Sequence, residues 1–168
     1  MFELKPLSTH AIDAALERAQ TYRLLNEPIL AESICRDVLR LDPNHQQALI
    51  EFVLALTDQF GDKKIGNINE ANEAIKKLES EYHREYYIGI LLERRAISHL
   101  KSPSPGRGFV AYDWLRDAMQ HYENAEQIRP KDNDESILRW NTCVRLIERH
   151  PEIRESEDDD HHLHHFDS

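Results

Sequence analysis

The sequence has few of the residues that break helices, cross-link a chain or anchor it in a membrane. Its 168 residues include 5 glycines and 7 prolines, and few segments alternate β-branched with polar residues, which excludes a β-rich fold. Two cysteines, Cys35 and Cys143, are too few for a disulfide scaffold and are typical of a reducing compartment. No apolar run approaches the roughly 18 residues of a membrane span, and the first residues lack a signal-peptide pattern. We therefore expect a soluble, cytoplasmic protein with no membrane contact.

Motifs of the common enzyme classes are also missing. The chain contains no G-x-S-x-G, no phosphate-binding G-x-x-x-x-G-K-[ST], no H-E-x-x-H and no C-x-x-C. Its 21 basic and 31 acidic residues give a formal charge of −10, which repels the phosphates of a nucleic acid. We therefore expect a protein that is not an enzyme, has no cofactor and binds no nucleic acid.

Apolar residues at helical spacing are abundant. Seven segments carry apolar stripes with the period of an α-helix, and short breakers such as Asp42-Pro43-Asn44 and KSPSPGRG (101–108) separate them. The stripe of the first segment is expected to reach Leu25, that of the second to run from Ile29 and Leu30 to Leu41, and the fourth segment to end at His83-Arg84. The sequence thus predicts one all-α domain over residues 1–154.

Three of these segments share one phased pattern before the position at which they are expected to end, which is Pro43, His83 or Pro130. A small residue stands 12 positions earlier, an apolar or aromatic residue 8 earlier, and another apolar residue 5 earlier. The nine residues are Ala31, Cys35 and Val38, then Ala71, Ile75 and Leu78, then Ala118, Tyr122 and Ala125. Such a pattern on separate helices indicates an internal repeat.

This repeat resembles the tetratricopeptide repeat (TPR), a helix-turn-helix unit of 34 residues. Residues 12–45 match best: Tyr22 stands at the aromatic position of the first helix, and Ala31, Val38 and Pro43 at the small, apolar and proline positions of the second. The second unit carries a loop insertion around GDKKIGN (61–67), and the third is stretched by SPSPGRG (102–108). The resemblance implies about three degenerate repeats and a capping helix, in a stack of about seven antiparallel helices (an α-solenoid) with a concave face.

In this family the first helix of each pair lines the concave face and binds proteins. The resemblance therefore implies an interaction module (a TPR adaptor or scaffold) whose groove takes a peptide or helix of a protein partner. The expected groove residues are Leu16, Gln20, Arg23, Gln47, Ile50, Leu54, Tyr86, Glu93 and Asn141. Acidic Asp13, Asp58 and Glu93 favour a neutral or basic partner segment. An alternative is that the chain itself partly fills the groove.

Three arginines near the expected groove have two possible roles. Arg94, Arg95 and Arg139 are expected either to pair with Glu93 inside the protein or to bind an acidic partner. The sequence indicates no oligomeric state.

The segment 155–168 differs in composition from the rest of the chain. It contains six acidic residues and no Lys or Arg, so it carries −6 of the formal charge, and it is expected to be a disordered tail. Four histidines lie in it: His161, His162, His164 and His165. Imidazoles bind zinc, nickel and copper, so the alternative function is a metal-handling protein that uses this tail.

Overall fold

The computed structural model of the chain describes residues 1–61 and 66–156, and within these ranges it contains helices and no strand. The elements are a short 3-10 helix, η1 (Thr9–Ala11), and the α-helices α1 (Ile12–Leu24), α2 (Pro28–Leu41), α3 (Gln46–Asp58), α4 (Gly66–Lys76), α5 (Glu81–Leu100), α6 (Arg107–Gln127) and α7 (Glu135–Arg149). The predicted all-α class with seven helices is therefore confirmed for this part of the chain.

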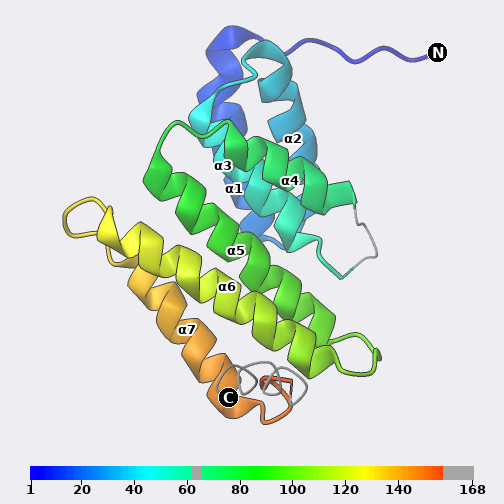
Figure 1. Cartoon of the computed structure of the whole chain (residues 1–168). Helices are drawn as coiled ribbons and strands as arrows, with labels where there is room; N and C mark the ends of the chain where they lie inside the picture. The colour runs from blue at the N-terminus through cyan, green and yellow to red at the C-terminus, as the bar shows by residue number, and fades with distance from the viewer. Residues whose placement is uncertain (62–65, 157–168) are drawn as a thin grey trace, which may run out of the picture.

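The helices follow one another through the molecule in sequence order, from α1 and α2 at one end to α7 at the other (Figure 1). Each helix packs against the next, and α3 contacts both α1 and α5 as well as its neighbours in sequence. This central position explains why most of α3, from Ala48 to Thr57, is buried. Within the described residues no helix combines the length and the apolar character needed to cross a membrane.

The core consists of two large apolar clusters that meet at α3 and α5. The first is formed mainly by α1 to α4 and includes Leu49, Val53 and Ile75. The second is formed by α5, α6 and α7 and includes Leu115 and Tyr122. The side chains of Leu54 and Tyr87 pack against both clusters, so the two halves of the molecule share one continuous core.

The nine residues of the phased pattern occupy equivalent environments in α2, in and just after α4, and in α6. Each of them is at most 2% exposed. The list is Ala31, Cys35, Val38, Ala71, Ile75, Leu78, Ala118, Tyr122 and Ala125. Small residues at the first position of each triplet let a neighbouring helix approach closely.

The boundary between α4 and α5 lies earlier than the sequence pattern predicted. The structure ends α4 at Lys76 and begins α5 at Glu81, so His83 and Arg84 lie inside a helix. Ser80 caps α5, because its Oγ accepts a hydrogen bond from the backbone N–H of His83 at 3.2 Å. The prediction was wrong because Leu78 and Tyr82 are both buried and continue the apolar pattern across the turn.

For the first two helices, the prediction that the residues at the ends of the apolar stripes are buried was also wrong. Leu25, Ile29, Leu30 and Leu41 are exposed rather than part of the core. The buried face of α2 is set by Ala31, Cys35 and Val38. At about 100° per residue, Ile29 points almost opposite to Ala31, so the sequence spacing itself separates Ile29 from the buried face.

Both cysteine thiols are buried, and burial raises the pKa of each to about 12. Compared with the ordinary value of 9.0, this lowers the thiolate fraction about a thousandfold, and only the thiolate reacts. We expect Ellman's reagent at pH 8 to react with folded protein at least about a hundredfold more slowly than with protein unfolded in urea. Fast reaction of one thiol in the folded protein would contradict its burial.

Candidate interaction surface

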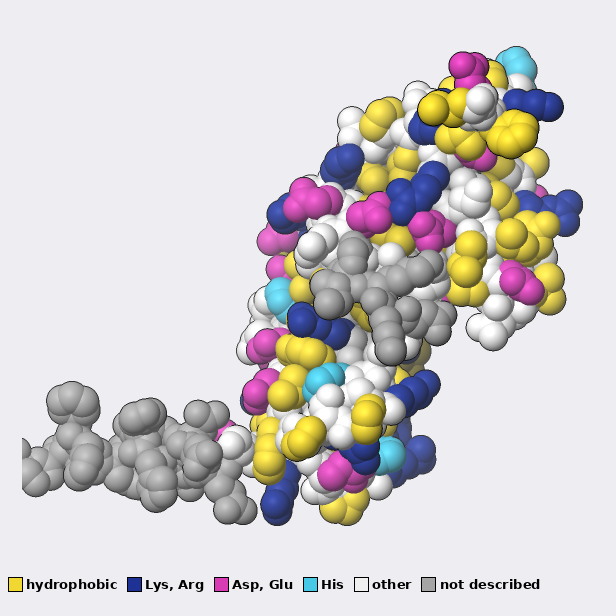
Figure 2. All heavy atoms as spheres, turned by 90° about the vertical axis from the view of Figure 1, so that its right-hand side faces the viewer, with side chains coloured by type: hydrophobic (Ala, Val, Ile, Leu, Met, Phe, Trp, Pro, Cys, Tyr) yellow, Lys and Arg dark blue, Asp and Glu magenta, His cyan; other side chains and the backbone are white. Residues whose placement is uncertain are grey.

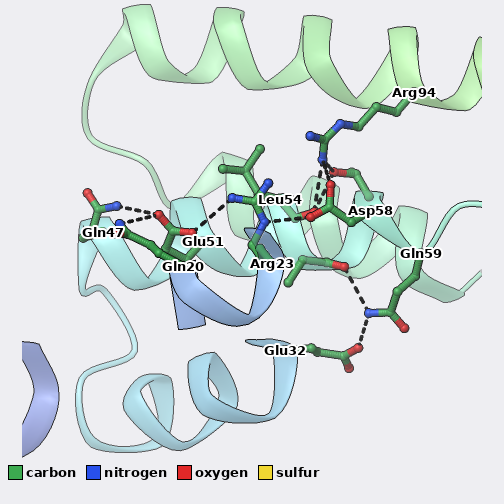
Figure 3. Close-up of polar contacts among 11 residues, drawn as sticks. Gln20, Arg23, Glu32, Gln47, Glu51, Leu54, Asp58, Gln59 and Arg94 are labelled. Atoms are coloured by element: carbon green, nitrogen blue, oxygen red, sulfur yellow. Dashed lines mark hydrogen bonds and ion pairs between the residues drawn. The ribbon is translucent and has the colours of Figure 1, made fainter. Parts of the chain in front are cut away.

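A buried carboxylate on α3 organises a polar network between α1 and α3 (Figure 3). The side chain of Glu51 lies in the interior, where the residue is 4% exposed. It accepts hydrogen bonds from Gln20 Nε2 at 2.8 Å, Gln47 Nε2 at 2.9 Å and Arg23 Nη1 at 3.3 Å. A charge removed from water is tolerated only when it is paired and hydrogen-bonded. These three donors therefore hold Glu51, and the two from α1, Gln20 and Arg23, also fix the orientation of α1 on α3.

Asp58, at the end of α3, extends the network to α5. Its two carboxylate oxygens pair with Arg23 Nε and with Arg94 Nη1, both at 2.7 Å. Arg94 also donates to Thr57 Oγ1 at 2.6 Å and to the carbonyl of Leu54 at 3.1 Å. Burial lowers the pKa of Arg94 and Asp58 offsets part of this effect, and a guanidinium remains protonated in any case. Asp58 therefore links α3 to α1 through Arg23 and to α5 through Arg94.

A second buried carboxylate repeats this arrangement between α5, α6 and α7. Glu93 is 2% exposed, and it accepts a hydrogen bond from the Tyr122 hydroxyl at 2.6 Å and one from Arg139 Nη1 at 3.3 Å. Burial is the main reason why the pKa of Tyr122 is raised far above its usual range, and the negative charge of Glu93 raises this pKa further. Tyr122 is therefore a permanent donor to Glu93.

Three predicted groove residues, Gln20, Arg23 and Gln47, do meet in one place. Their polar groups point at Glu51 (Figure 3), so they satisfy a charge of the protein itself. In this part of the predicted groove, along α1 and α3, the polar side chains therefore bond to the chain itself.

Leu16, Ile50 and Glu93 are not accessible, and this corrects their assignment as contact residues. They are 4%, 8% and 2% exposed. Leu16 and Ile50 belong to apolar clusters, and Glu93 is held by its two donors. The pattern of the repeat places these positions on the first helix of each pair, but it does not show how closely the next helix covers them.

Leu54, Tyr86 and Asn141 are partly exposed. Leu54 joins the two core clusters. Tyr86 stacks on Tyr82 with ring centroids 5.9 Å apart and meets the edge of Tyr87 at 5.1 Å. The first two of these predicted groove residues therefore stabilise the fold, whatever they also contact.

The three arginines near the expected groove have three different environments. Arg139 pairs with Glu93 at 3.3 Å, as one of the predictions had it. Arg94 pairs with Asp58 instead, and the guanidinium of Arg95 lies 4.0 Å from the ring centroid of Trp114. Each of the three arginines therefore has an interaction partner within the protein.

A group of exposed apolar side chains lies where α1 turns into α2. Leu24, Leu25, Ile29 and Leu30 are 89%, 65%, 59% and 45% exposed; we call these four residues the turn patch. Asn26 makes the turn possible, because its φ of 59° lies in the left-handed region that asparagine tolerates. The backbone N–H of Glu27 then bonds the carbonyl of Tyr22 at 2.8 Å, which ends α1 sharply.

A small pocket adjoins the turn patch. Its volume is about 210 Å³ and its walls are Arg23, Leu24, Asn26, Pro28 and Asp58; we call it the Arg23 pocket. The sequence resemblance had placed Arg23 in the groove and Asp58 among the acidic residues that influence the choice of partner. The pocket therefore combines an apolar edge with one cation and one anion whose positions the network fixes.

The sequence prediction missed two features of this surface. Glu51 was overlooked, although a single acid within the apolar run ALIEFVLAL (48–56) is the signal of a buried, paired charge. The turn patch was overlooked because Leu25, Ile29 and Leu30 were assigned to the core.

The four histidines of the expected metal site, His161, His162, His164 and His165, lie outside the described residues. Within residues 1–61 and 66–156, no group of three or more His, Cys, Asp or Glu side chains is arranged to hold a metal ion. Metal binding by the tail stays a prediction.

Comparison of the chain with protein-family models, with curated proteins and with solved structures finds no match.

Proposed function

We propose that the chain is a non-enzymatic, TPR-like helical stack that binds a segment of a protein partner. Two features of the fold support the stack: the nine buried repeat positions in α2, around α4 and in α6, and the packing of α1 on α3 and of α3 on α5. These are the neighbours expected when successive helix pairs stack in register.

The observation that carries the binding role is the turn patch beside the Arg23 pocket. Four large aliphatic side chains within seven residues are at least 45% exposed, and clustered apolar side chains at a surface mark an interaction site. The adjoining Arg23 and Asp58 are held by ion pairs, so they are already ordered before binding. An apolar anchor beside preorganised polar groups is the arrangement of a binding hot spot.

We infer that the partner segment presents an apolar side chain to the turn patch and a polar group to the Arg23 pocket. The pocket offers both a guanidinium and a carboxylate, so a backbone amide or a neutral polar side chain finds a donor and an acceptor there. Gln20 and Gln47 lie on the same two helices, but their side chains hold Glu51, so the contact is centred on the turn patch and the Arg23 pocket.

Site-specific photocrosslinking tests the proposal. A photoreactive residue in place of Leu24 is expected to yield one dominant adduct with a partner in cell extract. The matched control is the same residue in place of Leu138, which is 63% exposed on α7. Equal labelling from the two positions would contradict a binding site at the turn patch.

The turn patch is expected to affect binding without affecting the fold. Leu24→Asp together with Leu25→Asp should abolish the adduct, here detected through a photoreactive residue in place of Ile29. Because both leucines are exposed, the free energy of unfolding should change by no more than about 0.5 kcal/mol per substitution. Denaturation in urea measures this, and retained binding in the folded double variant would refute the proposal.

A further inference from the structure

A short segment before the first helix has apolar side chains that no described residue of the chain covers. Residues 1–8 contain no helix or strand, and Met1, Phe2 and Leu4 are 122%, 105% and 72% exposed. Leu7, by contrast, is partly buried against Leu16, Val38 and Ala48. The segment is thus anchored at Leu7 and extends from the molecule (Figure 1).

An apolar pocket of about 320 Å³ lies on the outer side of α3, between α2 and α4. Its apolar walls are Leu39, Pro43, Leu49, Phe52 and Ala74, and its polar walls are Asn69, Glu70, Glu73 and Lys77. We call it the outer pocket. Hydrophobic side chains interrupt the charged surface on the side of the molecule seen in Figure 2.

The floor of the outer pocket is held in place by charged groups. The guanidinium of Arg36 lies 4.9 Å from the ring centroid of Phe52, and it pairs with Glu70 at 2.8 Å and with Glu32 at 2.7 Å. The pocket is therefore formed by the chain itself before a ligand arrives, with a volume of about 320 Å³.

We propose that the outer pocket receives residues 2–5 of a second copy of this chain, in a reciprocal dimer. In an extended segment, Phe2 and Leu4 point to one side and Glu3 and Lys5 to the other. Phe2 and Leu4 are apolar side chains that can fill the space between the apolar walls of the pocket. The rim of the pocket carries an acid, Glu73 of α4, which also pairs with Lys76 at 2.6 Å, and a base, Lys77, just after α4. Glu3 and Lys5 point away from the floor of the pocket, so in one direction of the segment Lys5 lies at the rim near Glu73 and Glu3 near Lys77.

The placement of the segment favours a second copy over its own chain. Lys5 and Leu7 lie beside Asp37, Arg40 and Leu41 of α2. The outer pocket uses Leu39 of α2, which lies about 150° around the axis of α2 from that face. The segment therefore leaves α2 on the wrong side for its own outer pocket. Reciprocal exchange between two copies makes the contact twice and closes the assembly.

Mixed cross-linking separates the two arrangements. Chains with Leu4→Cys are mixed with chains with Glu73→Cys and oxidised with diamide; the native Cys35 and Cys143 are buried and do not interfere. We expect a disulfide-linked heterodimer in at least about fivefold excess over a control mixture of Leu4→Cys with Leu138→Cys. An equal yield in the two mixtures overturns the proposal. So does a disulfide that forms only within one chain carrying both Leu4→Cys and Glu73→Cys.

A charge exchange tests the direction of the segment. Sedimentation of the otherwise unmodified chain should show dimers whose share rises with concentration. Lys5→Glu and Glu73→Lys should each weaken the dimer at least about fivefold, and the chain carrying both changes should regain it. Since the Glu73 side chain is 67% exposed, loss of folding does not complicate this experiment. A chain that remains monomeric at all concentrations, or a double variant weaker than either single one, refutes the proposal.

Discussion

Arg139→Met is expected to lower the free energy of unfolding by about 3 kcal/mol, at the lower end of the range for breaking one partner of a buried ion pair. Glu93 is 2% exposed, and its partners in the structure are Arg139 and Tyr122. The substitution keeps the length and apolar stem of the side chain but leaves a carboxylate in the interior with one neutral donor. The effect stays at the lower end because the Arg139 side chain is 31% exposed, which admits water. Urea denaturation measures it.

The control for this prediction removes the charge on the other side of the pair. Glu93→Gln in the Arg139→Met background should recover at least about half of the loss, because an amide is much less costly to bury than an unpaired carboxylate. If Arg139→Met changed stability no more than a surface substitution, the pair between α5 and α7 would be wrongly placed. A double variant as unstable as Arg139→Met would show that lost packing, rather than the buried charge, causes the effect.

Gly89→Ala is expected to destabilise the protein by about 2 kcal/mol, although the same change inside a helix usually stabilises it by about 1 kcal/mol. Gly89 lies in α5 and faces the Tyr122 ring of α6. A Cβ at this position would lie 2.5 Å from the Tyr122 ring, a separation that real Cβ atoms do not adopt. The ring cannot retreat easily, since Tyr122 is fully buried and bound to Glu93. The clash therefore outweighs the gain in helix propensity.

A double-mutant cycle isolates this contact. Tyr122→Leu alone should be destabilising because it shortens a core side chain and removes a donor to Glu93. In that background Gly89→Ala should cost less than in the unmodified chain, with a coupling of at least about 1 kcal/mol. Additive effects of the two substitutions would mean that the ring of Tyr122 does not limit the approach of α6 to α5.

Local sequence information predicted much of the helical framework. The breakers at Pro43 and Pro130 separate helices as expected, and the spacing of small and apolar residues identified nine buried positions. The segment 101–108 also separates two helices, although its last two residues, Arg107 and Gly108, already belong to α6. These predictions succeed because helix propensity and helical periodicity depend on residues within a few positions of one another. The helix boundary at Ser80 was not predicted, for a related reason. The buried Leu78 and Tyr82 continue the apolar period of one helix, and a single capping serine is a weaker signal than this period.

The candidate site was predicted only in part. The resemblance to tetratricopeptide repeats placed Arg23 in the groove on the concave face and Asp58 with it, and both residues line the Arg23 pocket. It also placed Leu16, Ile50 and Glu93 there, and they are buried. A position in a repeat specifies the direction of a side chain, whereas its exposure depends on the distance to the next helix.

The sequence by itself determined that this protein consists of helices, where most of them end, and which face of α2, α4 and α6 is buried. Tertiary structure alone decided the environment of the charges. Arg94 pairs with Asp58, 36 residues away in sequence, and Arg139 with Glu93, 46 residues away, and no local pattern links these residues. The physical reason is that the energy of a charge depends on its burial and on its nearest partners in space. Both arise only when α1, α3, α5 and α7 come together.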